Sequence, residues 1–293
     1  MDPVQRARRG LAIFFAVLVP VSVLLEVNIV KHGALSPERF VPLLWTPCFA
    51  SIVARIVMRE GIADVSFRLD RRSARSILLG CIYPIAVAAP AYGIAWALGM
   101  GQFEPAAMHP LGFEVPGGTP GERLLVNALI AVTLGPLVMG VFALGEEIGW
   151  RGYMLTRLID ARVPQPVLVS GLVWGLWHGP LILTKLYNPS PHPPLALLLF
   201  VVTVTGSSFM AARLRLDTGS VWPPVIMHAA WNAILVSFFD ASTHGASAPL
   251  WTGEGGVLVA LSTAVITAVL LRFRRSSSQA PRAEAPALGT VRL

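Results

Sequence analysis

The chain has 293 residues, of which 54% are hydrophobic and only 13% are charged, and its mean hydropathy is +0.65. Because soluble domains carry about 25% charged residues, this composition excludes an ordinary soluble protein. It predicts an all-α membrane protein that crosses the bilayer several times. The formal net charge of +7 does not indicate nucleic-acid binding, since the basic residues lie between apolar runs and there act as determinants of membrane orientation.

Eight apolar runs, taken in chain order, predict eight transmembrane helices. They cover residues 11–30, 40–58, 77–99, 124–144, 164–184, 195–214, 221–239 and 255–271. The basic start of the chain is also typical of a signal peptide, but no clear small-residue cleavage site follows, so we expect a retained helix. The prolines between residues 187 and 194 predict an extended turn. Cys48 and Cys81 fall inside apolar runs, where we expect small buried hydrophobic residues rather than disulfide partners or metal ligands.

The apolar runs also predict how the chain is organised. Residues 1–123 hold the first three helices and their loops, and residues 124–240 hold helices four to seven around an intramembrane polar cavity. Residues 241–275 contain the eighth helix. Residues 276–293 form a tail that is too poor in large apolar side chains to fold, so we expect it to be disordered.

The distribution of basic residues predicts the orientation of these helices. With eight spans and the N-terminus in the cytoplasm, 19 of the 23 lysine and arginine residues lie inside, and the outside holds only Lys31, Arg39, Arg123 and Lys185. This asymmetry follows the positive-inside rule. We therefore expect a multi-pass protein of the cell (plasma) membrane with both termini in the cytoplasm.

Two adjacent carboxylates, Glu146 and Glu147, follow the uncharged run 124–144. Arg151 lies four residues after Glu147, on the same helical face, so these two side chains are predicted to form an ion pair. Glu146 points about 100° away and has no charged partner at that spacing. A carboxylate in the bilayer costs roughly 2.5–3.5 kcal/mol on insertion scales and usually has a function. Glu146 is therefore the candidate base, and Glu147 with Arg151 the candidate structural support.

Two histidines in later runs are candidate partners of Glu146. His178 lies in the run 164–184 and His228 in the run 221–239, where Asn232 follows one helical turn later on the same face. A single histidine in a span is more often a packing residue, but the joint occurrence with the glutamates favours a shared site. The predicted orientation puts Glu146 near the cytoplasmic end of its span and lets all four groups share the inner half of the membrane. The other four histidines fall in external loops, and we assign them no role.

These motifs give the chain a family resemblance over roughly residues 124–239. It resembles the CPBP family of intramembrane proteases, which includes the type II CAAX prenyl endopeptidases and bacterial bacteriocin-processing or immunity proteins. The resemblance rests on Glu146-Glu147-x-x-x-Arg151, His178 and His228-x-x-x-Asn232, with Trp150 and Gly152 as further common family residues. The second motif usually reads Phe-x-x-x-His, and here Trp174 stands at the Phe position. That exchange keeps an aromatic ring one turn before His178, and we expect Trp150 and Trp174 to shape the substrate groove.

The resemblance implies a glutamate-dependent peptide hydrolase. Glu146, assisted by His178, would activate a water for attack on a peptide carbonyl. His228 and Asn232 would donate hydrogen bonds to the oxyanion, each typically worth about 2.7–4 kcal/mol. We expect no cofactor. Zinc is the alternative, because Glu/His/His is a feasible zinc set, but Asn232 is a poor zinc ligand and a good oxyanion donor.

The expected partners are a peptide or membrane-protein substrate and the lipid bilayer, and no nucleic acid. Two other functions stay open: a non-catalytic membrane partner or immunity protein that keeps the fold, and a transporter whose buried glutamate relays protons. The intact set of four residues favours the enzyme. A transporter would be expected to show paired broken helices in two halves, and no such repeat is found in the sequence.

Overall fold

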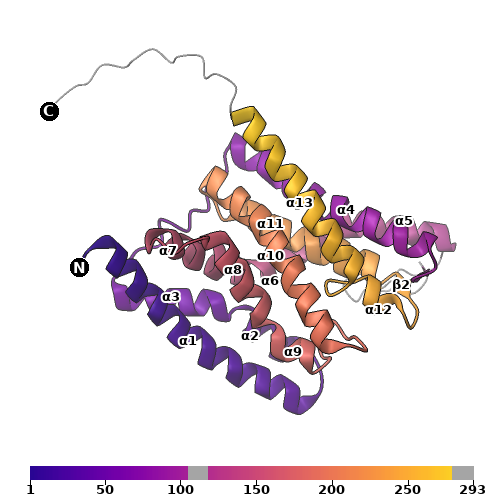
Figure 1. Ribbon diagram of the computed structural model, residues 1–293, viewed down its shortest axis with the longest axis horizontal. Helices are drawn as coiled ribbons and strands as arrows, with labels where there is room; N and C mark the ends of the chain where they lie inside the picture. The colour runs from indigo at the N-terminus through magenta and orange to yellow at the C-terminus, as the bar shows by residue number, and fades with distance from the viewer. Residues whose placement is uncertain (105–117, 279–293) are drawn as a thin grey trace.

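The computed structural model describes residues 1–104 and 118–278, and these residues are mostly helical (Figure 1). The helices before the glutamate pair are α1 (Pro3–His32), α2 (Pro37–Leu44), α3 (Thr46–Met58), α4 (Arg71–Ala97) and α5 (Pro120–Val132). The next elements are α6 (Leu134–Gly149), the π-helical segment η3 (Trp150–Met154), α7 (Leu155–Asp160), α8 (Pro166–Trp177) and α9 (Gly179–Leu183). The last are α10 (Pro193–Thr218), α11 (Trp222–Ala230), the π-helical segment η4 (Trp231–Asp240), α12 (Ala248–Trp251) and α13 (Val257–Ser278).

The all-α expectation needs one small correction. The two-residue strands β1 (Gln102–Phe103) and β2 (Thr243–His244) pair antiparallel, with Gln102 opposite His244. They tie the segment after α4 to the segment after η4, and the Oγ of Ser247 adds a hydrogen bond to the carbonyl oxygen of Met100 (2.9 Å).

Helix ends follow local sequence signals. Asp2 Oδ1 accepts a hydrogen bond from the Val4 amide (2.8 Å) at the start of α1, and Gly33 ends that helix with a φ of 67°. Thr119 and Glu122 form a capping box at the start of α5. These contacts satisfy amide groups that have no partner inside the helix.

Several of the helices are long and apolar enough to cross a membrane. Within the described part of the chain, four pass this test by themselves, namely α1, α4 from Ser73, α10 and the continuous pair α11–η4. The number rises to six if α2–α3 and the stretch from α5 to α7, each bent by 41°, are single spans. The runs predicted as spans five and eight correspond to shorter apolar helices, α8 and α13. A multi-pass membrane protein is therefore supported, while eight spans stay a prediction.

Two predicted boundaries differ from the structure. The fourth run does not end at the glutamate pair, because the helical path continues through η3 and α7 to Asp160. Glu146 therefore lies within a helical path that is longer than the predicted run, and its position near the cytoplasmic end of the span stays a prediction. Residues 276–278, predicted as disordered tail, belong to α13, and residues 279–293 lie outside the described part of the chain.

Every second connection between the long helices lies at the same end of the bundle. We call it the basic end (residues 59–70, 161–165 and 219–221). Arg55 contacts Asp64 (2.5 Å), and Arg157 contacts both Glu60 (2.9 Å) and Asp64 (3.0 Å). Arg215 donates to the carbonyl oxygen of Asp64. Burial opposes ionisation of Asp64, but the hydrogen bond and charge of Arg55, together with Arg157, outweigh it and lower the pKa of Asp64. This network fixes the loop 59–70 against α7 and α10.

The remaining connections form the opposite end, here called the hairpin end (residues 33–36, 98–104, 184–192 and 241–256). It contains the β1–β2 pair and a hydrogen bond from Tyr187 Oη to Glu254 Oε2 (2.5 Å). In Figure 1 the N-terminus and α7 lie at the left, and α9, α12 and β2 lie towards the lower right. The chain thus runs back and forth between the two ends, as the predicted spans require.

Glycines let α6 approach its neighbours closely. A Cβ at Gly149 would lie 2.3 Å from the Cβ of Pro47, and a Cβ at Gly145 would lie 2.8 Å from the indole ring of Trp45. The residues on both sides of the glutamate pair therefore need to be glycine, because α6 there crosses the junction of α2 and α3. This packing holds the pair in place.

We predict that Gly149→Ala lowers the melting temperature of the protein in detergent. The added methyl group has no room at Pro47, and overpacking of this kind typically costs about 1–3 kcal/mol. Gly140→Ala is the matched control on the same helix, since a Cβ there meets nothing within 4 Å and alanine is a better helix former than glycine by about 1 kcal/mol. Equal melting temperatures for the two variants would contradict the close contact.

Candidate active site

The glutamate pair lies in the last turn of α6. Glu147 is fully buried, and its Oε1 accepts a hydrogen bond from Arg151 Nη1 at 2.7 Å. The ion pair predicted from the four-residue spacing is therefore confirmed. Arg151 is also buried, with 1% of its surface exposed. A buried ion pair is tolerated only where further hydrogen bonds satisfy both partners.

Those further contacts tie Arg151 to two other helices. Its Nη2 donates to Ser208 Oγ on α10 (2.9 Å), and its guanidinium lies over the Trp174 ring on α8, 4.2 Å from the centroid. The spacing of residues in the sequence did not reveal Ser208. The planar guanidinium can satisfy a carboxylate, a hydroxyl and an aromatic face together.

The π-helical segment η3 is held from the basic end. A π turn breaks the regular pattern of backbone hydrogen bonds, and two arginines donate to its carbonyl oxygens. Arg55 Nη2 reaches Gly152 O (3.2 Å), and Arg215 Nε reaches Arg151 O (3.3 Å). The backbone that carries Arg151 is therefore fixed by residues of α3 and α10.

Glu146 has a different set of neighbours. It is 3% exposed, and its Oε2 accepts hydrogen bonds from Trp174 Nε1 (2.7 Å) and Trp150 Nε1 (3.2 Å). Among the described residues, no lysine, arginine or histidine forms an ion pair with this carboxylate. The two indole donors fix one oxygen atom, and the other makes no hydrogen bond to the described part of the chain.

His178 caps the C-terminus of α8. Its Nδ1 lies 3.0 Å from the carbonyl oxygen of Trp174. A carbonyl can only accept, so Nδ1 carries the proton of this hydrogen bond, and in the neutral ring Nε2 is left as the acceptor. Aromatic rings pack around the imidazole, with Phe200 at 4.9 Å and Tyr187 at 5.6 Å between centroids.

His228 on α11 contacts the ion pair directly. Its Nδ1 donates to Glu147 Oε1 at 3.0 Å, and its ring meets the edge of Trp174 with 5.2 Å between centroids. Sequence spacing did not predict this bond, because the two residues come from different helices. Glu147 therefore orients His228 as well as Arg151, and the Nε2 atom of His228 is left free for another partner.

Asn232 lies at the start of η4, four residues after His228. Its backbone oxygen accepts a hydrogen bond from Ser237 Oγ (2.9 Å). Its side-chain amide makes no hydrogen bond to any residue that the structure describes. Asn232 and His228 line the same cavity, as their four-residue spacing predicted.

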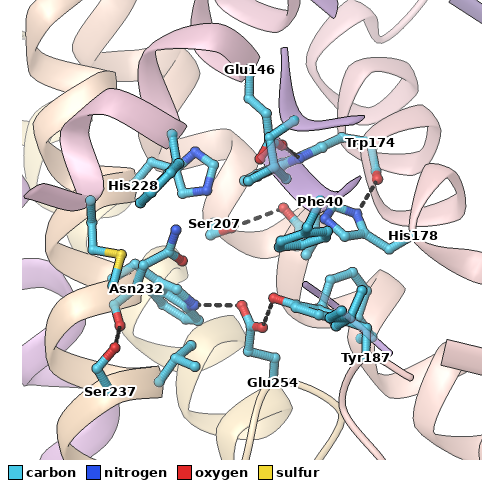
Figure 2. Close-up of a pocket in the computed structure, with 18 of the residues that line it drawn as sticks. Phe40, Glu146, Trp174, His178, Tyr187, Ser207, His228, Asn232, Ser237 and Glu254 are labelled. Atoms are coloured by element: carbon cyan, nitrogen blue, oxygen red, sulfur yellow. Dashed lines mark hydrogen bonds between the residues drawn. The ribbon is translucent and has the colours of Figure 1, made fainter. Parts of the chain in front are cut away.

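The cavity that joins these residues, here called cavity 1, has a volume of about 300 Å³ (Figure 2). Glu146, His178, His228 and Asn232 all line it, whereas Glu147 and Arg151 do not. Most of the other lining residues are apolar or aromatic, among them Phe40, Met139, Phe142, Trp174, Tyr187, Phe200, Met227 and Trp231. An apolar pocket with a few convergent polar groups is typical of a binding or catalytic site.

The two tryptophans expected to shape the substrate groove lie in different surroundings. Trp174 lines cavity 1, whereas Trp150 does not line it: Trp150 is fully buried and donates to Glu146. The helical turn from residue 146 to residue 150 places that indole against the carboxylate. The role of both tryptophans in a substrate groove stays a prediction. Tyr187 and Glu254 also line cavity 1 and were not assigned from the sequence. The signal for Glu254 was a carboxylate directly before the apolar run 255–271.

The donor set was also tested for a metal site. Among residues 1–104 and 118–278, no group of three or more His, Cys, Asp or Glu side chains is arranged to hold a metal ion. The Nδ1 atoms of both site histidines are already bound within the protein.

Comparison with known proteins identifies one region. Residues 123–234 match the family described as Type II CAAX prenyl endopeptidase Rce1-like. The match covers Glu146, Glu147, His178, His228 and Asn232 and ends before Glu254. It confirms the family resemblance that the motifs indicated. No curated protein matches the chain.

We predict that Glu147→Gln strongly destabilises the protein. The change leaves Arg151 buried without its counter-charge, and breaking a buried pair typically costs about 3–5 kcal/mol. Asp160→Asn is the control, because its ion pair with Arg157 is exposed on the aspartate side and such pairs contribute about 1 kcal/mol or less. The measurement is the melting temperature in detergent. Similar small shifts for both variants would contradict the role assigned to Glu147.

Proposed function

We propose that this chain is an intramembrane peptide hydrolase in which Glu146 activates a water molecule, because residues 123–234 match the Type II CAAX prenyl endopeptidase Rce1-like family. The family match and the apolar helices support a membrane protease. One observation supports the finer mechanism most directly. Glu146, His178, His228 and Asn232 line one cavity, although they come from α6, α8, α11 and η4.

Glu146 is the proposed general base. Its Oε2 is held by two indole N–H groups, so its Oε1 is available to accept a proton from water. His178 assists, because its Nδ1–H bond to the Trp174 carbonyl leaves Nε2 as an acceptor. A base needs to lie within hydrogen-bond reach of the water and in a place with little bulk water, and the largely apolar wall of cavity 1 meets the second condition.

His228 and Asn232 are the proposed oxyanion donors. The tetrahedral intermediate of peptide hydrolysis carries a negative oxygen, and preorganised N–H groups stabilise it. The Asn232 amide provides such a group and is not engaged elsewhere in the described structure. Glu147 fixes the ring of His228 through Nδ1, so Nε2 can donate to the oxyanion when the imidazole is protonated. In this proposal Glu147 and Arg151 are supporting residues and do not touch the substrate.

The proposed mechanism uses no metal ion, and zinc is the alternative. The spacing of the described donor side chains supports the metal-free mechanism, because no three of them are arranged to hold one metal ion. We therefore derive no step through a metal. The substrate is proposed to be a peptide or a membrane protein that reaches cavity 1 from the bilayer or from one of its surfaces.

The test of the mechanism compares the two glutamates. Glu146→Gln is expected to abolish cleavage of internally quenched peptides in detergent while the melting temperature stays close to that of the wild type, because the amide keeps the shape and removes the base. Glu147→Gln is expected to lower the melting temperature and to retain partial activity per folded molecule. A folded, active Glu146→Gln variant would overturn the assignment of the base.

Metal analysis and the same cleavage assay test whether activity depends on a metal ion. The purified chain is expected to contain no stoichiometric zinc and to stay active in the presence of a chelator. Loss of activity on chelation, restored by zinc, would favour the metal-dependent alternative. A folded wild-type chain that cleaves no peptide or membrane protein would favour the non-catalytic alternative, in which the fold serves as a membrane partner or immunity protein.

We also propose that both termini and the basic end lie in the cytoplasm of a cell with the protein in its plasma membrane. The proposal rests on the 19 of 23 basic residues that this orientation places inside. The position of Glu146 nearer to the cytoplasmic side of the membrane also stays a prediction.

A labelling experiment tests this orientation. In a chain with Cys48→Ala and Cys81→Ala, single cysteines are introduced as Ala63→Cys at the basic end and Ala246→Cys at the hairpin end, both at exposed positions. A membrane-impermeant maleimide should label Ala63→Cys only from the cytoplasmic side and Ala246→Cys only from outside. Reversed labelling would overturn the orientation, and labelling of both from one side would contradict the arrangement of the two ends.

A further inference from the structure

Glu254 is a buried carboxylate in the turn between α12 and α13. It is 8% exposed, and both of its oxygens are engaged. Tyr187 Oη donates to Oε2 (2.5 Å) and Trp231 Nε1 donates to Oε1 (2.8 Å). Figure 2 shows Glu254 on the side of cavity 1 opposite Glu146. Its position is therefore fixed by neutral donors from two other parts of the chain.

A second cavity begins at Glu254. Cavity 2 has a volume of about 450 Å³ and lies at the hairpin end. Four residues line both cavities: Leu35, Tyr187, Val236 and Glu254. Glu254 is the only charged residue of these four, so it stands at the junction where a peptide that fills both cavities would pass.

The Asp, Glu, Lys and Arg side chains that line the two cavities are all acidic. Glu146 and Glu254 line cavity 1, and Glu254 and Asp240 line cavity 2. Asp240 accepts a hydrogen bond from Tyr92 Oη (3.1 Å). No lysine or arginine from the described residues lines either cavity, and the basic groups there are His178 and His228 in cavity 1 and His244 in cavity 2. Glu254 itself is held by neutral donors and forms no ion pair among the described residues.

This arrangement favours the binding of a positively charged side chain. A carboxylate in a site of low dielectric attracts a cation strongly and repels an anion, because water does not screen the charges. A lysine or arginine side chain at the junction would complete the charge balance that the protein leaves open. A free C-terminal carboxylate placed there would be repelled by the Glu254 carboxylate.

We propose that Glu254 determines substrate specificity by binding a cationic side chain of the peptide at the junction of the two cavities. The proposal rests on the peptide-hydrolase function and adds its substrate class: peptides with a lysine or arginine in the segment that passes Glu254. Glu254 lies after the residues that match the family, so this feature is a property of this chain and not of the matched segment. Glu254 also ties the turn after α12 to the segment after α9, and the test needs to separate these two roles.

The experiment measures peptide binding by fluorescence polarisation in detergent. Three pools of octapeptides carry a neutral dye, blocked termini and neutral residues, and they differ only in one central residue, which is lysine, norleucine or glutamate. The protein is the full chain with Glu146→Gln, so that no peptide is cleaved. We expect the lysine pool to bind about tenfold more tightly than the norleucine pool and the glutamate pool to bind most weakly.

Variants then locate the preference. Glu254→Gln should reduce the ratio of lysine to norleucine affinity to about one, with little change for the norleucine pool. Glu104→Gln is the matched control, because Glu104 is an exposed carboxylate at the same end and lines neither cavity. It should keep the full ratio. A purely structural role of Glu254 would weaken all three pools equally and leave the ratio unchanged.

The outcomes separate this inference from the proposed function. Two results overturn the role of Glu254 even if the wild-type protein cleaves peptides. One is equal binding of the three pools by the Glu146→Gln chain, here called the starting chain. The other is an unchanged ratio of lysine to norleucine affinity when a folded chain also carries Glu254→Gln. A lysine preference that depends on Glu254 supports it even if the wild type cleaves nothing, which would instead remove the hydrolase. If Glu254→Gln does not fold, Glu254→Met is the second neutral variant. If neither folds, the starting chain decides alone: a lysine preference supports the inference and its absence overturns it.

Discussion

The ion pair between Glu147 and Arg151 is the interaction on which the rest of the site depends. Both groups are removed from water, so each needs partners from the other or from neighbouring helices. Arg151 donates to Ser208 and lies over the Trp174 ring, and Glu147 Oε1 accepts from His228, while Glu147 Oε2 has no hydrogen-bond partner among the described residues. These contacts join five helical elements: α6, η3, α8, α10 and α11. The same contacts that satisfy a buried charge also bring the candidate catalytic groups to one cavity.

The neighbouring glutamates divide their tasks because the helix turns them to different surroundings. Glu147 meets a cation and an imidazole, whereas Glu146 meets only the indole N–H groups of Trp150 and Trp174. A carboxylate held by neutral donors keeps an oxygen available for water. In the proposed mechanism the chemistry depends on the absence of a counter-charge at Glu146 within the described structure, and the stability of the site is expected to depend on the presence of one at Glu147.

The two ends of the bundle contribute differently to this site. The basic end fixes the backbone, because Arg55 and Arg215 donate to carbonyl oxygens of η3 and connect them to the loop 59–70. The hairpin end provides most of the lining of cavity 2 and contributes Leu35, Tyr187 and Glu254 to cavity 1. In our proposals, opposite ends of the bundle thus determine the orientation of the chain in the membrane and the substrate specificity of its cavities.

Local features could be predicted from the amino-acid sequence alone: the apolar runs, the ion pair of Glu147 with Arg151 at four-residue spacing, and the set of polar residues inside the runs. These depend on composition and helical periodicity, which adjacent residues carry. The folded chain was needed to show that His228 binds Glu147, that the helix continues past Glu146 to Asp160, and that Glu254 lines two cavities. These features join segments far apart in the chain, and no local spacing specifies which faces of packed helices meet.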